Sequence, residues 1–255
     1  MTHLIVEFQG AKIKVENRGI ANINIRNFFL NYTAIYANQI GSDSILVGIS
    51  DKPWVYLDVQ SERGLEMLLV ELPKTYNNFA VVEPWAETVI HRFYGGQIFD
   101  ELRCKKLCLS ESDFIKSAVE DRWWSEREKL VIGPLRVEES AYIQANHKYA
   151  DFTDEPYITD RILKGIHFGV RTLDGQLVAW VLTHDDGAIG FLYVMEAYRG
   201  RGIASKLIER VVEEHFKRNL IPFVHIEVEN LPSLNLVQKS GFKQVGDVAW
   251  FSLKE

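Results

Sequence analysis

One stretch decides the interpretation of this chain: Leu192-Tyr193-Val194-Met195-Glu196-Ala197-Tyr198-Arg199-Gly200-Arg201-Gly202-Ile203-Ala204. Its first three residues are apolar and predict a strand. Apolar residues at helical spacing after Ile203 predict a helix over residues 203–218. The two glycines between them allow a tight turn, because they carry no Cβ. The sequence therefore predicts a strand, a glycine loop and a helix in direct succession.

The start of the predicted helix is a candidate anion site. The first N–H groups of a helix have no partner within the helix, and its dipole favours negative charge there. Arg199, Arg201 and Lys206 add positive charge. A pyrophosphate would suit such a site. Many strand-to-helix turns use Gly-x-Gly only for its geometry, so the loop alone leaves both interpretations open.

Two common classes of phosphate loop do not fit. A Walker loop requires Gly-Lys-Ser/Thr, but Gly202 is followed by Ile203. A dinucleotide-binding fingerprint requires a third Gly or Ala, and that position is Ser205. Too little chain follows Gly202 to complete the long parallel sheet that accompanies this fingerprint.

The loop resembles that of the GNAT superfamily of acyl-CoA-dependent N-acyltransferases, which reads Arg/Gln-x-x-Gly-x-Gly/Ala. Arg199-Gly200-Arg201-Gly202-Ile203-Ala204 matches it at each specified position. Downstream, the segment from Asn230 to Gly241-Phe242 is similar to the family's second motif, Asn-x-x-Ala/Ser to Gly-Phe. The resemblance covers about the last 120 residues.

The resemblance implies an α/β (α+β) fold with a mixed, splayed sheet flanked by helices. It implies acetyl-CoA or another acyl-CoA as co-substrate and no metal. Two central strands would part to admit the pantetheine arm, with a bulge between Gly190 and Tyr193 opening the gap. The implied cofactor-binding residues are Leu192, Tyr193, Val194, Arg199, Gly200, Arg201, Gly202, Ile203, Ala204 and Asn230.

A narrower resemblance is to the glycine N-acyltransferase family, carried by His147-Lys148-Tyr149-Ala150-Asp151-Phe152 and Gly175-Gln176-Leu177-Val178-Ala179-Trp180. It implies acyl transfer to a small amine, such as glycine or another amino acid. Two alternatives stay open. Acidic residues, among them Asp185 and Asp186, favour a peptide or protein N-acetyltransferase. Ala188 and Val237, which stand where related enzymes carry acid–base groups, favour a non-catalytic acyl-CoA-binding protein.

Catalysis needs a base, because an amine with a pKa near ~10 arrives protonated. The glycine branch places a glutamate where this chain has Ala188. Glu227 is the first remaining candidate, with His225 beside it, because alternate residues of a strand share one face. A solvated strand face is the competing interpretation. His184 and Asp185, at the preceding turn, are further candidates.

The chain of 255 residues suggests two domains, an N-terminal α/β domain over residues 1–130 and an acyltransferase domain over residues 131–255. In the first half, residues 45–49 and 54–59 predict a hairpin, and Ser61 is expected to cap a helix. Residues 120–129 predict a charged helix, and residues 135–137 a strand. No close internal repeat is evident.

Composition excludes several classes of protein. Hydrophobic residues make up 47% and charged residues 25%, which is typical of globular chains. A net charge of −6 argues against a nucleic-acid binder. No apolar run reaches the ~18 residues of a membrane span. Cys104 and Cys108 lack a nearby histidine and are expected to be buried thiols.

We expect a cytoplasmic protein that acts as a monomer or weak dimer on a small-molecule amine. The family resemblance also allows a mitochondrial location, although no transit sequence is seen.

Overall fold

The computed structural model describes residues 3–8, 11–31, 36–40, 44–48, 54–81, 83–117, 129–148 and 153–254. They form two compact units. The first comprises residues 1–106, 227–229 and 245–255, and the second comprises residues 107–226 and 230–244. We predicted a boundary at residue 130, but it lies between Lys106 and Leu107. The final strand returns to the first unit because Ala249–Ser252 pairs with Asn78–Val81, a long-range contact that no local pattern reveals.

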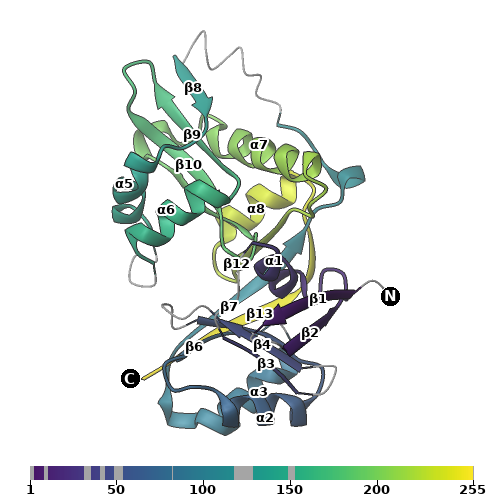
Figure 1. Ribbon diagram of the computed structural model, residues 1–255. Helices are drawn as coiled ribbons and strands as arrows, with labels where there is room; N and C mark the ends of the chain where they lie inside the picture. Colours follow the sequence, from purple (N-terminus) through teal and green to yellow (C-terminus); the bar gives the residue numbers. More distant parts are fainter. Residues whose placement is uncertain are drawn as a thin grey trace. The chain divides into compact units, whose positions relative to one another are not determined.

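The first unit is built around one sheet. Its elements, in chain order, are β1 (His3–Phe8), β2 (Ala11–Glu16), α1 (Ile23–Asn31), β3 (Tyr36–Ile40), β4 (Ser44–Gly48), β5 (Trp54–Asp58), α2 (Glu62–Glu71), β6 (Asn78–Val81), α3 (Pro84–Tyr94), η1 (Gly95–Gln97), β7 (Ile98–Cys108) and β13 (Lys243–Leu253). Strands β7, β13, β6, β5, β4 and β3 lie side by side in that order. β4 and β5 are antiparallel, as the predicted hairpin required, and β5 and β6 are parallel. α2 and α3 lie next to each other in Figure 1.

The helix α2 starts where the sequence predicts. The side chain of Ser61 accepts a hydrogen bond from the N–H of Gly64 at 3.1 Å and caps the helix. Leu65, Leu68 and Leu69 recur at helical spacing and are buried. Together with residues of β6 and α3 they build the core of this unit. The core also contains Val55, Leu57, Val59, Tyr76, Phe79, Ala86, Val89, Ile90, Ala249, Phe251 and Leu253.

The second unit has a four-stranded antiparallel sheet in the order β11–β10–β9–β8. Its elements are η2 (Glu111–Asp113), β8 (Leu130–Gly133), η4 (Val137–Glu139), α5 (Ser140–Ala145), α6 (Glu155–Lys164), β9 (His167–Thr172), β10 (Leu177–Thr183), β11 (Ile189–Val194), η6 (Glu196–Tyr198), α7 (Ile203–Lys217), β12 (Phe223–Glu227) and α8 (Leu231–Lys239). The last residue of β12 is grouped with the first unit.

Two local predictions near the start of this unit have different outcomes. The strand predicted over residues 135–137 is wrong, because the strand there is β8, slightly earlier in the chain. The N–H of Arg136 instead donates to the Glu139 carboxylate at 2.7 Å and opens a 3-10 turn. The predicted helix over residues 120–129 falls almost entirely on residues 118–128, which lie outside the described part of the chain.

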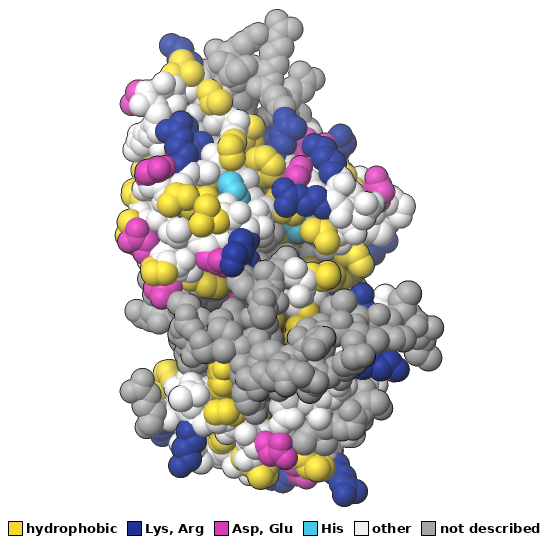
Figure 2. All heavy atoms as spheres, viewed as in Figure 1, with side chains coloured by type: hydrophobic (Ala, Val, Ile, Leu, Met, Phe, Trp, Pro, Cys, Tyr) yellow, Lys and Arg dark blue, Asp and Glu magenta, His cyan; other side chains and the backbone are white. Residues whose placement is uncertain are grey.

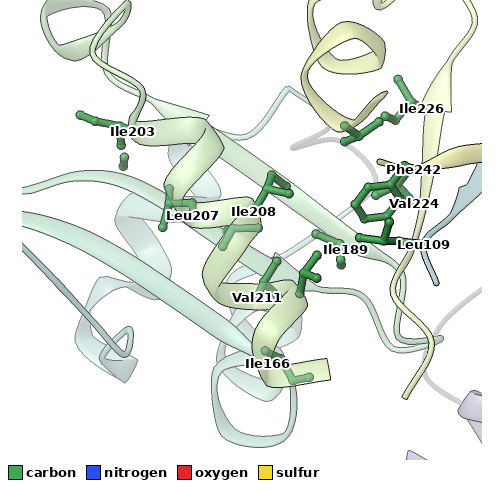
Figure 3. Packing of buried hydrophobic residues seen from close by; sticks show 14 of the residues in the cluster. Leu109, Ile166, Ile189, Ile203, Leu207, Ile208, Val211, Val224, Ile226 and Phe242 are labelled. Atoms are coloured by element: carbon green, nitrogen blue, oxygen red, sulfur yellow. The ribbon is translucent and has the colours of Figure 1, made fainter. Parts of the chain in front are cut away.

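Each face of this sheet is covered by helices. Ile203, Leu207, Ile208 and Val211 of α7 belong to one buried cluster with Ile189, and Figure 3 shows Val211 close to Ile189. The other face packs against α5 and α6, where Trp180 is only 1% exposed. Trp180 is therefore a core residue. Trp250 is half-buried in the first unit, with its ring centroid 5.4 Å from that of Trp54.

The element order three strands, helix, strand, helix, strand occurs twice along the chain. It runs from β3 to β7 and again from β9 to β13, with α7 in the place of α2. The two runs differ at one point. β5 and β6 pair in parallel, whereas their counterparts β11 and β12 do not pair with each other. The first run therefore has a continuous sheet from β5 to β6, whereas the second run has a gap in strand pairing between β11 and β12.

Among the described residues on the face drawn in Figure 2, basic and acidic side chains are interspersed. In the part of the chain that the structure describes, no helix has both the length and the apolar character needed to cross a membrane.

Candidate active site

The glycine loop lies between β11 and α7, as predicted. Gly200 and Gly202 have φ angles of +78° and +74°, a region that favours glycine. Gly202 is the N-cap of α7 and provides no side-chain hydrogen bond to the helix. The first turn of α7 also contains no acidic residue. Its leading N–H groups, together with the helix dipole, thus offer hydrogen-bond donors and positive potential that suit an anion.

The two arginines of the loop brace its backbone. The Nε of Arg199 donates to the carbonyl of Val194 at 3.0 Å, and a terminal nitrogen of Arg201 donates to the carbonyl of Ala197 at 2.9 Å. The guanidinium of Arg201 also lies 5.2 Å from the centre of the Tyr198 ring. Both arginines therefore hold the loop in shape while keeping positive charge beside the start of α7.

The expected third cation is absent from this site. Lys206 is buried on the inner face of α7, and its Nζ lies 2.7 Å from the Glu209 carboxylate. Glu209 in turn accepts a hydrogen bond from the N–H of Ser117. The prediction that Lys206 adds positive charge at the loop is wrong, because its charge is neutralised inside the unit.

β11 carries the bulge that the sequence analysis placed between Gly190 and Tyr193. Tyr193 pairs with Trp180 and Gly190 pairs with Leu182, so the register shifts between them. Phe191 takes a φ of +53° at this point. With β12 unpaired from β11, the bulge lies at the open side of the sheet.

The predicted strand residues alternate along β11. Leu192 and Val194 pack against the α7 side, and Tyr193 stacks on Trp180 with ring centroids 4.5 Å apart. The side chains are thus engaged in packing, which leaves the backbone as the part of this strand that a ligand would meet. Asn230 caps α8, accepting from the N–H of Ser233 at 3.3 Å.

The two predicted catalytic residues lie on β12. Val224 and Ile226 of this strand are in the core, and His225 and Glu227 alternate with them and are half-buried. The His225 ring lies edge-on to Phe223, 5.6 Å away. His225 belongs to the second unit and Glu227 to the first.

The positions at which related enzymes carry acid–base groups are apolar here. Ala188 is 3% exposed, and its N–H donates to the Asp186 carboxylate at 2.9 Å. Val237 is 2% exposed and belongs to the core beneath α7.

A cluster on the α6 side of β11 was only partly foreseen. The rings of His184 and His147 each lie 4.4 Å from the Phe191 ring, and the Nδ1 of His184 lies 3.3 Å from the Tyr157 hydroxyl. His184 was one of several candidates at this turn. His147 and Tyr157 were missed, because they lie far apart in the sequence and only the fold brings them together.

Burial sets the protonation of this cluster. It lowers the pKa of His184 to about 3, with the charges of His147 and Arg161 adding to the effect. Burial also lowers the pKa of His147 to about 4. The pKa of Tyr157 is raised well above its usual value by burial and by nearby Asp185. All three side chains are therefore neutral at physiological pH.

No group of three or more metal-ligating side chains is present among the described residues. Cys104 is a buried free thiol, as predicted, and Cys108 is a half-buried free thiol.

Comparisons with known proteins agree with this geometry. Residues 135–242 match the model of the Acetyltransferase (GNAT) family. No curated protein matches the sequence.

Three solved structures illustrate the fold. A Drosophila protein is similar over 92% of this chain and 90% of its own, with a TM-score of 0.74 and 16% identity. A putative GNAT-family acetyltransferase from Novosphingobium aromaticivorans has a TM-score of 0.58 and 17% identity, over 87% of this chain and 91% of its own. A GCN5-related N-acetyltransferase-like protein from Streptococcus suis has a TM-score of 0.59 and 16% identity, over 92% and 100%.

Proposed function

We propose that the chain is an N-acyltransferase of the GNAT type, whose family model matches residues 135–242, and that it transfers an acyl group from an acyl-CoA to a small amine. Glycine or another amino acid is the acceptor that we propose. We also propose, as the sequence leads us to expect, that the protein is cytoplasmic and acts as a monomer or weak dimer.

The observation that carries this proposal is the start of α7. A glycine N-cap with φ of +74°, no capping side chain and no acidic residue in the first turn leaves backbone donors for a pyrophosphate. The N–H groups of Ile203 and Ala204 and the flanking arginines would hold it. The pantetheine arm would then follow the backbone of Leu192–Val194 toward the bulge.

The reaction joins the amine nitrogen to the thioester carbonyl carbon and breaks the carbon–sulfur bond. The nitrogen loses a proton and the CoA thiolate gains one, so the products are an amide and free thiol. We propose Glu227 as the base, with His225 beside it. Their position on the face of β12 that alternates with the core residues supports this assignment.

Burial argues against two of the acidic residues that would line a groove for a basic peptide. A peptide would need an acidic groove, and Asp185 and Asp186 were two of its proposed members. They are only 8% and 1% exposed. Asp186 accepts from the N–H of Ala188, and Asp185 from the N–H of Asp186. These carboxylates therefore stabilise the turn before β11 and are not available to line a groove.

The test is free-thiol release from a panel of acyl-CoAs, each combined with free amino acids, other small amines or a peptide library. We expect release with at least one acyl-CoA and a small amine. Glu227→Gln should reduce the rate without weakening CoA binding, which calorimetry measures. Tight CoA binding without thiol release across the panel would contradict the proposal and favour a binding protein. Release with peptides alone would identify a peptide acetyltransferase.

A further inference from the structure

A histidine that the proposed CoA site does not use packs against the bulge in β11. His184 comes from the turn between β10 and β11, and its ring stacks on Phe191, the residue with φ of +53°. The interplanar angle is 34° and the centroid distance is 4.4 Å. An imidazole thus covers the point at which the β10–β11 ladder is interrupted.

Three contacts fix the position of this ring. Its Nδ1 lies 3.3 Å from the Tyr157 hydroxyl, and Phe191 supports one face. Its Nε2 lies directly over Gly190, where an added Cβ would come within 2.2 Å. The backbone is held too, since the N–H of His184 donates to the carbonyl of Ala188 at 2.8 Å. Gly190 is therefore required by the close approach of the imidazole.

The hydrogen bonds around Tyr157 bear on which ring nitrogen carries the proton. The N–H of Asp185 can only donate, and it donates to the Tyr157 oxygen at 3.3 Å. The hydroxyl hydrogen of Tyr157 then has two acceptors within reach, the Nδ1 of His184 and the Asp185 carboxylate. A neutral imidazole that accepts at Nδ1 carries its proton on Nε2. The Asp185 carboxylate, which also acts on Tyr157, is the competing acceptor, so the tautomer of His184 is the decisive observable.

We propose that the Nε2–H of His184 donates a hydrogen bond to the thioester oxygen during acyl transfer, with Tyr157 as the positioning residue that fixes the tautomer. The inference rests on the proposed function, which brings the thioester to the bulge. Negative charge grows on that oxygen as the amine nitrogen attacks, and it disappears when the carbon–sulfur bond breaks. The histidine keeps its proton throughout.

A neutral imidazole suits this role. Burial keeps the pKa of His184 near 3, so the ring is a poor proton acceptor at physiological pH but remains a hydrogen-bond donor. A fixed donor aimed at developing charge needs no reorganisation during the reaction. Neutral histidine acts in this way in other enzymes when its pKa is lowered.

Two substitutions separate a donor from a base. His184→Phe keeps an aromatic ring against Phe191 but has no donor, and it should lower kcat about a hundredfold. His184→Gln places an amide N–H near the original Nε2 and should retain kcat within about tenfold of wild type. The KM for acyl-CoA should stay within about twofold in both variants. If His184 acted as a proton acceptor instead, both variants would lose the same factor in kcat. Equal losses of kcat in the two variants, or a wild-type kcat in His184→Phe, would therefore overturn the inference.

The tautomer of His184 can be measured directly, and a purely structural role of Tyr157 would leave it unchanged. Nitrogen-15 NMR of labelled histidine should show the proton of His184 on Nε2, and Tyr157→Phe should shift this tautomer population while lowering kcat by a smaller factor. A proton on Nδ1 in the wild type would overturn the inference. If the wild-type protein releases no thiol with any acyl-CoA, the proposed function fails and the inference with it. Thiol release together with equal losses in the two His184 variants would overturn the inference alone.

Discussion

Replacing Gly202 by Asp tests the anion site by placing a negative charge at the cap of α7. Gly202 has φ of +74° and precedes the uncapped first turn. Asp is one of the few side-chain-bearing residues that enter this left-handed region, and it is favoured at helix N-caps. The substitution should therefore leave the fold intact while its carboxylate competes for the same N–H groups as a bound phosphate.

The size of the effect follows from the distance. A carboxylate on residue 202 and a phosphate on the next N–H groups would be about 6 Å apart. Two unit charges at this separation, with an effective dielectric constant of ~20, repel by about 3 kcal/mol, which is roughly a hundredfold in affinity. The Gly202→Asp variant should bind CoA about a hundred times more weakly than wild type.

Calorimetric titration with CoA measures this change, and Gly202→Asn is the matched control. Asn has nearly the same shape and the same tolerance of the left-handed region, but no charge. We expect Gly202→Asn to bind CoA within a few-fold of wild type, and added salt to recover part of the affinity of Gly202→Asp. Equal losses in the two variants would show that the geometry of Gly202 matters and its electrostatics do not. Unchanged binding in Gly202→Asp would refute the anion site.

Three further predictions concern stability and stoichiometry. Lys206→Met should lower the free energy of unfolding by about 3 kcal/mol, because it leaves the Glu209 carboxylate buried without its cation; urea denaturation measures this, and a loss below about 1 kcal/mol would contradict it. Burial holds the pKa of His147 at about 4 when folded, against ~6.5 when unfolded, so its contribution to stability is complete above pH ~6.5 and is lost as the pH falls toward 4. The urea midpoint should therefore drop between pH 7.5 and pH 5, and less so in His147→Gln; an equal drop would assign the effect to other groups. Calorimetry should also show one CoA bound per chain, and a stoichiometry of two would contradict the assignment of binding to the second unit alone.

Local sequence signals were sufficient to predict the position of the glycine loop. Gly200 and Gly202 stand directly between an apolar strand and a helix with a regular apolar face, and each of these features depends on neighbours in the sequence. The cap of α2 by Ser61 was predictable for the same reason. The bulge in β11 could be predicted only through the family resemblance, because a bulge depends on the partner strand as well.

The direction of individual side chains and the pairing of distant strands could not be predicted from the sequence. Lys206 follows the loop closely, and only the helical phase of α7 decides that it points inward to Glu209. The domain boundary was misplaced because the pairing of β13 with β6 joins segments at opposite ends of the chain. The His184 cluster was incomplete for a related reason, since Tyr157 reaches it from a separate helix.

The repeated element order allows the position of the proposed CoA site to be compared with its counterpart in the first unit. At the end of β5, where β11 has its glycine loop, the first unit has the buried carboxylate of Asp58, which pairs with Arg18 and accepts from Asn22 at 2.8 Å. The following helix is capped by its own Ser61. A helix start whose N–H is already satisfied has fewer donors to offer an incoming phosphate. The pairing of β5 with β6 also closes the edge along which a pantetheine arm would run. The second unit differs in each of these features, so its open edge and uncapped helix favour the proposed CoA site there and not in the first unit.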